Sequence, residues 1–147
     1  MSSRVRARVD LAAPVEEVFA FFDDLANAAV LVPTLAEITT VDPVASGGRR
    51  VEYTIRDRHG ILHDASSEHL EYDPPRRTVT RNVQSGVVTT MTRDFQELDA
   101  GTRVVATVEW EMPLGGVARL VSAPLRGPYR RGLRNALHAA REALTAG

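Results

Sequence analysis

The period of the hydrophobic positions changes along the chain and divides it into three parts. Residues 4–11 carry apolar side chains at every second position, which predicts a half-buried strand. Residues 14–23 repeat apolar side chains at helical spacing, with Pro14 expected at the first helical position, and a second short helix is expected at 25–31. The tail, residues 114–147, is expected to be helical, kinked or interrupted near Pro124 and Pro128 and regular beyond them.

Short extended runs separated by glycine, proline and aspartate turns fill the middle of the chain. Because short connections favour antiparallel neighbours, these runs and the first strand predict one curved sheet of about seven strands. The chain is therefore expected to be one α+β domain, residues 1–147, in which the long C-terminal helix covers the concave sheet face. The predicted runs are 36–43, 50–57, 61–72, 77–84, 87–98 and 102–113.

The less charged face of each strand is expected to point into the domain, because a bare carboxylate is costly to bury. In the stretch GILHDASSEHL, residues 60–70, the odd positions include two histidines and no carboxylate. In 77–84 the inward set is expected to include Arg81, unless a bulge reverses that strand. The other inward predictions are Val51, Tyr53, Ile55, His63, Ala65, Ser67, His69, Val79, Val83, Thr89, Met91, Arg93, Phe95, Val104, Ala106, Val108, Trp110 and Met112.

Small side chains lie on both sides of the expected sheet–helix interface. Ala65, Ser67 and Ala106 face inward on the sheet, while Ala136 and Ala140 share the inner face of the helix with Leu133. Such residues do not fill a sheet–helix space to the usual packing density of about 0.74. With several polar groups pointing inward, the sequence predicts a cavity that holds a ligand or water.

Composition removes several classes of chemistry. The formal net charge of −1 gives no overall attraction to nucleic acid. Cysteine and lysine are both absent, which excludes disulfides, thiolate nucleophiles, cysteine-bound zinc and Schiff-base catalysis. His63 and His69 would lie roughly 20 Å apart along a strand at ~3.3 Å per residue, so no metal site and no cofactor are expected. Without a signal peptide or an apolar segment able to span a membrane, we expect a cytoplasmic monomer or homodimer with no stable membrane insertion.

The chain resembles the START-like helix-grip (SRPBCC) superfamily and, within it, the polyketide cyclase/dehydrase family. The resemblance covers essentially the whole chain and is carried by VDLAAPVEEVFAFFDDL, EYDPPRRTVTR, DFQELDAGTRVVATVEWEMPLGG and the long C-terminal tail. One departure is NAAVLVPTL, where Val30 and Leu31 precede Pro33 in place of the family's frequent tryptophan. The resemblance implies a ligand cavity between the curved sheet and the C-terminal helix.

Two functions follow from the resemblance, and the residues leave both open. A cyclase/dehydrase (aromatase)-like enzyme would act on a polyketide-type substrate, with Arg93 polarising a carbonyl and His69 acting as a base. A non-catalytic carrier or sensor would bind a lipid, isoprenoid or quinone. An interaction module without a ligand is a third reading. The expected ligand-binding residues are Tyr53, His63, Ser67, Arg81, Met91, Trp110 and Leu133.

Three features also have ordinary structural explanations. The two histidines can be plain hydrogen-bonded residues, and Arg93 can pair internally with Glu97 or a helix carboxylate. The arginines of the tail, Arg130, Arg134 and Arg141, form a stripe that is either a solvated face or a contact for anionic lipid or a partner.

Overall fold

The computed structural model describes residues 2–111 and 117–146, with side chains for residues 4–110 and 127–145. Seven strands form one antiparallel sheet in the order β1-β7-β6-β5-β4-β3-β2. The strands are β1 (Ser2–Leu11), β2 (Leu35–Pro43), β3 (Arg49–Arg56), β4 (Leu62–Asp73), β5 (Arg77–Gln84), β6 (Val87–Leu98) and β7 (Gly101–Glu111). The helices are α1 (Val15–Asp23), the 3-10 helix η1 (Leu25–Asn27), α2 (Ala28–Leu31) and α3 (Val117–Ala146).

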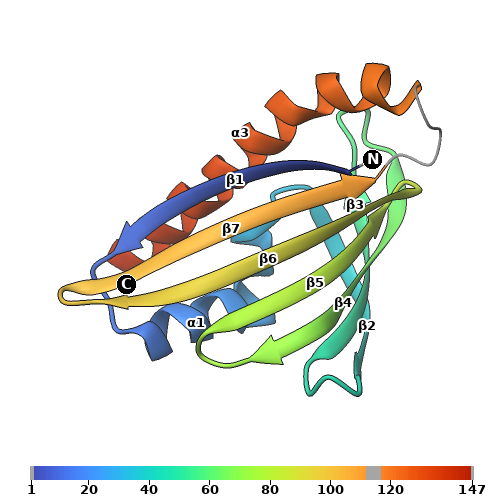
Figure 1. The fold of residues 1–147 in the computed structure, drawn as a ribbon. Coiled ribbons are helices and arrows are strands. Elements are labelled where there is room, and N and C mark those ends of the chain that lie inside the picture. The colour runs from blue at the N-terminus through green and yellow to red at the C-terminus, as the bar shows by residue number, and fades with distance from the viewer. Residues whose placement is uncertain (1, 112–116, 147) are drawn as a thin grey trace.

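The sheet is strongly curved, and the helices lie on its concave side. In Figure 1, α3 runs along β1 from the upper right to the lower left. Helix α1 lies below α3, near the end of the sheet where β6 turns into β7. This arrangement is the α+β helix-grip fold that the sequence predicts, with two short helices after the first strand. None of the helices in the described part of the chain is long and apolar enough to cross a bilayer.

The helix α1 forms because one of its faces is apolar at helical spacing. Val15, Val18, Phe19 and Phe22 are all buried, and Glu16 lies in the first turn, where a carboxylate favours the helix dipole. Pro14 is the N-cap residue, one position before the place predicted for it.

The second predicted helix consists of two pieces that share one segment. Asp24 caps η1, with its carboxylate accepting a hydrogen bond from the N–H of Ala26 at 2.9 Å, and α2 follows directly. No residue of η1 or α2 is fully buried. The half-buried state of this segment matters because its inner side faces the cavity described below.

The main core lies between α1, α3 and the strands β1, β6 and β7. Its inward positions on β7 are those predicted from the charge pattern, with Val104 and Ala106 at 0% exposure. A second, smaller cluster lies on β3 and β4 and consists of Val51, Tyr53 and Ala65. The buried residues of the main core are Val5, Val9, Leu11, Val15, Val18, Phe19, Phe22, Phe95, Val104, Ala106, Val108, Trp110, Leu133, Leu137 and Ala140.

Two expectations for the C-terminal part are changed by the structure. Helix α3 is continuous through Pro124 and Pro128, so of the kink or interruption predicted there the interruption does not occur. The last strand ends at Glu111, and the inward position predicted for Met112 lies outside the described residues.

Candidate functional site

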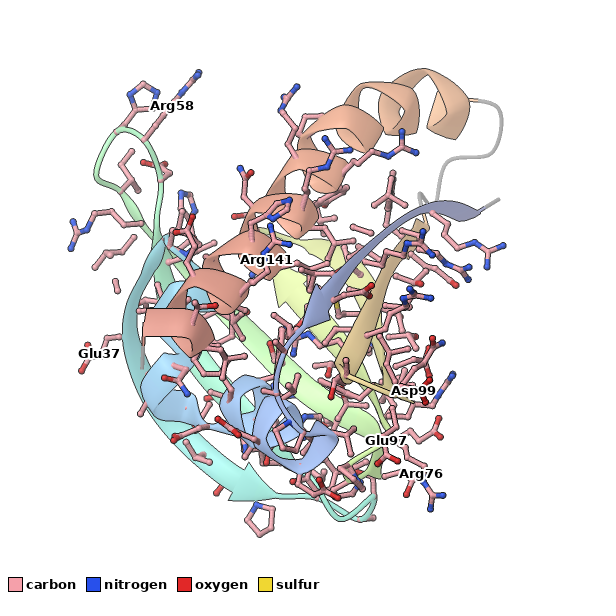
Figure 2. All side chains as sticks on the ribbon, turned by 90° about the vertical axis from the view of Figure 1, so that its left-hand side faces the viewer. Glu37, Arg58, Arg76, Glu97, Asp99 and Arg141 are labelled. Atoms are coloured by element: carbon pink, nitrogen blue, oxygen red, sulfur yellow. The ribbon has the colours of Figure 1, made fainter. Side chains whose placement is uncertain are left out.

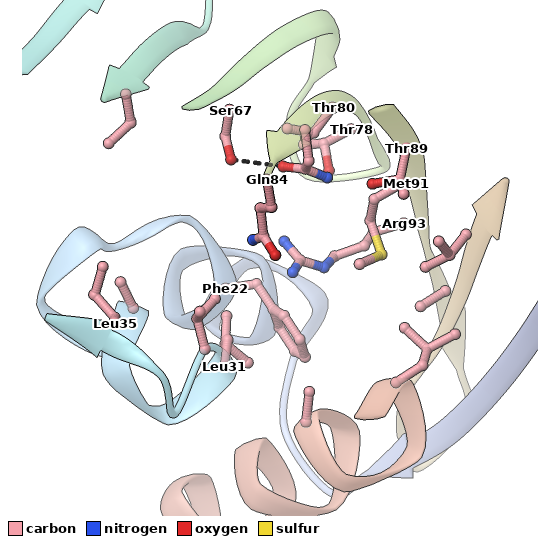
Figure 3. A pocket seen from close by; sticks show the side chains of 18 of the residues that line it. Phe22, Leu31, Leu35, Ser67, Thr78, Thr80, Gln84, Thr89, Met91 and Arg93 are labelled. Atoms are coloured by element: carbon pink, nitrogen blue, oxygen red, sulfur yellow. Dashed lines mark hydrogen bonds between the residues drawn. The ribbon is translucent and has the colours of Figure 1, made fainter. Parts of the chain in front are cut away.

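A cavity of about 610 Å³ separates the two apolar clusters. Its walls come from α1, the η1–α2 segment, the inner face of β3 to β7, and the inner face of α3 (Figure 3). Three of the small side chains that predicted incomplete packing line it, Ser67, Ala106 and Ala136, whereas Ala65 and Ala140 belong to the two apolar clusters. The sequence expectation of a sheet–helix cavity therefore agrees with the structure.

Six of the nine predicted site residues line this cavity. They are Tyr53, Ser67, His69, Met91, Arg93 and Leu133. Trp110 lies behind the wall, at 1% exposure, with its ring centroid 4.7 Å from that of the lining residue Tyr129. The remaining two predicted residues, His63 and Arg81, do not line it.

His63, the second residue of β4, contacts the β3–β4 turn and does not line the cavity. Its Nε2 atom lies 2.8 Å from Oδ2 of Asp57, and its side chain is 36% exposed. The hydrogen bond from His63, followed by backbone donors, lowers the pKa of the Asp57 carboxyl. His63 therefore stabilises the hairpin turn. It lies across the sheet from the lining residue Ile55, but its ring is held by Asp57 and does not line the cavity, so the ligand contact predicted for it was wrong.

The face predicted for β5 was also wrong. Arg81 is exposed, and the residues that line the cavity from this strand are Thr78, Thr80, Asn82 and Gln84. Directly paired residues on neighbouring strands share a face, so Asn82 opposite Ser67 has to point inward with it. The prediction failed because Val79 and Val83 were given more weight than the charge of Arg81 on the same face, although the even positions carry no charge.

Arg93 is the predicted site residue that brings a positive charge to the cavity wall. Within the described part of the chain it makes no ion pair and no side-chain hydrogen bond, and its Cζ atom lies 5.3 Å from the centroid of the Phe22 ring. Burial lowers the pKa of Arg93 to about 10, against an opposing effect of the Asp23 charge. The guanidinium is therefore a cation inside the protein, and Figure 3 shows it extending from β6 into the cavity. The internal partner expected as an alternative, Glu97, is exposed instead.

His69 is held in one orientation by the backbone of the neighbouring strand. Its Nδ1 atom accepts a hydrogen bond from the N–H of Arg49 at 3.0 Å, and its carbonyl accepts one from Ser46 at 2.8 Å. A neutral imidazole whose Nδ1 is an acceptor carries its proton on Nε2. The Nε2–H group makes no hydrogen bond to a described residue, so it is available to a bound molecule as a donor.

The ionisation of His69 makes folding sensitive to acid. Burial, and next the charge of Arg49, lower its pKa below the ordinary 6.5. Since the unfolded chain then binds the extra proton more readily, the free energy of unfolding falls as pH drops through 6.5 towards the folded-state pKa. We expect His69→Gln to reduce the loss of stability between about pH 7 and about pH 5.5, measured by urea unfolding.

The matched control for this measurement is His59→Gln, because His59 is exposed in the β3–β4 turn. It is expected to leave the pH dependence of the wild type unchanged. A His69 variant with the full wild-type loss would contradict the assignment of a neutral, buried ring.

Gly48 is required at its position because the His69 ring lies directly over it. A Cβ atom there would be 2.4 Å from Nδ1 and 2.6 Å from Cβ of His69. We expect Gly48→Ala to lower the free energy of unfolding by about 1–3 kcal/mol through overpacking. Urea unfolding measures this change. The control is Gly132→Ala in α3, where an added Cβ atom would have no other atom within 4 Å. This variant should stabilise the helix by up to about 1 kcal/mol. Equal effects of the two variants would show that His69 does not occupy this place.

Four polar side chains on β3, β4 and β5 form a hydrogen-bonded chain along the cavity wall. Gln84 Nε2 lies 3.0 Å from the Tyr53 hydroxyl, which lies 3.2 Å from Ser67 Oγ. Ser67 donates to Oδ1 of Asn82 at 2.6 Å (Figure 3). With this direction of donation, the NH₂ group of Asn82 remains a free donor at the end of the chain. Asn82 and Gln84 were missed because the sequence pattern placed them on the outer face.

Asp23 at the end of α1 connects the helix to the β3–β4 part of the sheet. Its carboxylate accepts a hydrogen bond from Tyr72 at 2.7 Å, and Arg49 pairs with it at 3.5 Å while also donating to its backbone carbonyl. Burial, then the hydrogen bond to Asp23, raises the pKa of Tyr72 to about 12. Asp23, Arg49 and Tyr72 are distant in sequence, so no local sequence pattern predicts their contact.

The described residues contain no cluster of three or more histidine or acidic side chains that could bind a metal ion. The site is instead a largely apolar cavity with donor groups at Arg93, His69 and Asn82.

Comparison with known families gives a match over residues 2–142 to the family described as polyketide cyclase / dehydrase and lipid transport. The chain belongs to this family. The match covers nearly the whole domain, in agreement with the resemblance read from the sequence motifs. No curated protein matches the chain.

Solved structures with the same fold include proteins of diverse origin. A Rhodobacter sphaeroides protein is 18% identical with a TM-score of 0.73, the alignment covering 98% of this chain and 93% of the other. A Thermus thermophilus protein, TTHA0849, is 24% identical with a TM-score of 0.69, covering 98% of both chains. The di-domain aromatase/cyclase BexL from the BE-7585A biosynthetic pathway is 20% identical with a TM-score of 0.72, covering 96% of this chain and 49% of BexL. At these identities the likeness establishes the fold.

Proposed function

We propose that the cavity binds a small apolar molecule that presents a carboxylate or carbonyl oxygen to Arg93. The observation that carries this proposal is the guanidinium of Arg93, which enters a mainly apolar cavity without a carboxylate partner among the described residues. A buried cation is costly unless it is paired or hydrogen-bonded, and an oxygen acceptor on a ligand would supply the missing partner.

The size and the other polar groups of the cavity support the same ligand class. A volume of about 610 Å³ falls in the range of about 300–1,000 Å³ typical of small-molecule sites. His69 Nε2–H and the Asn82 amide add donors, so a molecule with a second oxygen can satisfy them as well. Lipids, isoprenoids, quinones and polyketides all include molecules of this kind.

Catalysis on the bound molecule is the second candidate, favoured by membership of a family that includes cyclases and dehydrases. Arg93 would polarise a carbonyl and so assist enolisation. The base role predicted for His69 has a cost, because its only free lone pair, on Nδ1, already accepts the Arg49 N–H. The ring would have to give up this bond to take a proton. We therefore place binding first and turnover second.

The test is a pair of probes that differ only in the polar end. Native mass spectrometry of the purified protein is expected to reveal a co-purified apolar molecule. After its removal, dodecanoic acid should displace the fluorescent probe 1-anilinonaphthalene-8-sulfonate at lower concentration than 1-dodecanol does. If neither compound displaces the probe and no ligand co-purifies, the proposal fails.

A further inference from the structure

Three connections lie at the same end of the sheet, and Figure 2 shows that the β3–β4 turn and the start of α3 are on opposite sides of it. The turn between β3 and β4, residues 57–61, the turn between β5 and β6, residues 85–86, and the first half of α3 all lie at the upper right of Figure 1. We call this set the hairpin end. Ser85 and Val87 of the β5–β6 turn, and Pro128 and Tyr129 of α3, line the cavity. The cavity therefore extends to the hairpin end.

Apolar side chains are exposed at this end without a partner. Ile61 is 57% exposed and Leu62 is 52% exposed, the two highest values among the large apolar side chains that the structure describes. Val88, beside the β5–β6 turn, is 38% exposed. Exposed apolar residues at the end of a hairpin can insert into the interface of a lipid bilayer.

Two arginines of the same hairpin precede these apolar residues. Arg56 and Arg58 are exposed on the same hairpin and make no ion pair with a described residue. The one acidic residue of the turn, Asp57, is occupied by His63 and by the backbone N–H groups of residues 59 and 61. On α3, at the other side of this end, residues 127–131 add two exposed arginines and no acid, Arg130 and Arg131, and the exposed Arg134 follows in the second half of the helix.

The opposite end of the molecule has a different composition. Arg76 there pairs with Asp73 at 3.7 Å, and Glu97 and Asp99 are exposed (Figure 2). Figure 2 shows these residues together at the lower right, far from Arg58 at the upper left. Because the whole chain has a net charge of −1, the basic hairpin end is balanced by acid elsewhere, which orients the molecule in the field of a negative surface.

We propose that the hairpin end docks on an anionic membrane surface and brings the end of the cavity lined by Ser85 and Tyr129 to the bilayer. Ile61 and Leu62 enter the interface between headgroups and acyl chains, while Arg56, Arg58 and the α3 arginines contact lipid phosphates. The exchange of a ligand with the bilayer rests on the proposed function, whereas the docking itself does not. Such docking is peripheral and reversible, and it requires no membrane-spanning segment.

The experiment is flotation of the full chain with vesicles of phosphatidylcholine alone and with about one third phosphatidylglycerol. Binding is expected to the anionic vesicles only and to weaken as salt is added, because exposed charges are screened. Arg56→Ser with Arg58→Ser should lower the partition coefficient about 30-fold, at about fivefold per arginine. Ile61→Ser with Leu62→Ser should lower it at least about fivefold.

The control is Leu70→Ser with Arg76→Ser, which removes an apolar residue of 48% exposure from β4 and an arginine from the opposite end. It is expected to bind like the wild type. Equal binding to neutral vesicles, no binding, or equal losses in the control and the hairpin variants would each overturn the proposal. So would a concentration-dependent dimer in sedimentation velocity that the Ile61/Leu62 variant abolishes, because the surface would then belong to a second copy of the chain.

A separate measurement keeps this proposal distinct from the proposed function. Displacement of 1-anilinonaphthalene-8-sulfonate by dodecanoic acid, without vesicles, should be unchanged in the hairpin variants. Loss of vesicle binding with normal displacement supports docking. Vesicle binding in a protein that does not take up either compound would support docking and overturn the ligand proposal alone.

Discussion

Removal of residues 128–147 is expected to abolish cooperative folding. This segment contributes Leu133 and Leu137, at 6% and 2% exposure, and Ala140, at 0%, to the main core. At ~1.5–3 kcal/mol per buried side chain, the two leucines alone stabilise the fold by roughly 3–6 kcal/mol, which approaches the 5–15 kcal/mol typical of a whole domain. The deletion also uncovers Trp110, which packs against Tyr129.

The measurement is urea unfolding followed by circular dichroism. The truncated chain should show no cooperative transition, whereas Leu137→Ala in the full chain should retain one and lose about 2–5 kcal/mol. Arg134→Ala, on the exposed side of the same helix, is the control and should change little. A truncated protein with the wild-type transition would mean that α3 does not cover the core.

Replacement of Arg93 by methionine is expected to change ligand preference without loss of the fold. Methionine fills a similar space and removes an unpaired cation, so the folded state is not penalised. A charge-assisted hydrogen bond contributes about 1.5–3 kcal/mol, so affinity for dodecanoic acid should fall about 10- to 150-fold. Affinity for 1-dodecanol should stay within a few-fold, because the apolar walls are unchanged.

Arg81→Met is the matched control, since Arg81 carries the same charge on the exposed face of the adjacent strand β5. It should leave both affinities as in the wild type, measured by displacement of the fluorescent probe and by calorimetry. Equal losses for the acid and the alcohol would indicate that Arg93 only shapes the wall. Unchanged binding of both would remove the acceptor-bearing ligand from the proposal.

The order and the type of the elements were predictable from the sequence because they follow from local patterns. Alternation in 4–11, helical spacing in 14–23 and turn residues between the later runs determine which backbone conformation each segment prefers. The predicted strands agree with β1 to β7 within a few residues at their ends. The cavity was also predictable, because small side chains on both facing elements leave space whatever their detailed placement.

The inward face of β6 illustrates what a sequence pattern can decide about a site. Thr89, Met91, Arg93 and Phe95 were predicted as one face because the alternative face carries Asp94 and more hydroxyls, and all four line the cavity. The prediction failed on β5, where two valines share a face with Arg81 and the opposite face is polar but uncharged. There the pairing of Asn82 with Ser67 decides the face, and pairing is a property of the assembled sheet.

What the sequence determined by itself was the fold class, the position of most strands and helices, and an inward Arg93. Only the tertiary structure decided that Arg93 lacks a carboxylate partner among the described residues, that the Arg49 backbone occupies Nδ1 of His69, and that Asp23, Arg49 and Tyr72 meet. The physical reason is the distance along the sequence between the groups that interact. Backbone preference and amphipathic period are set by residues within a few positions of each other, whereas hydrogen bonds, ion pairs and desolvation join groups 20 to 49 positions apart that come together only when the sheet closes around α3.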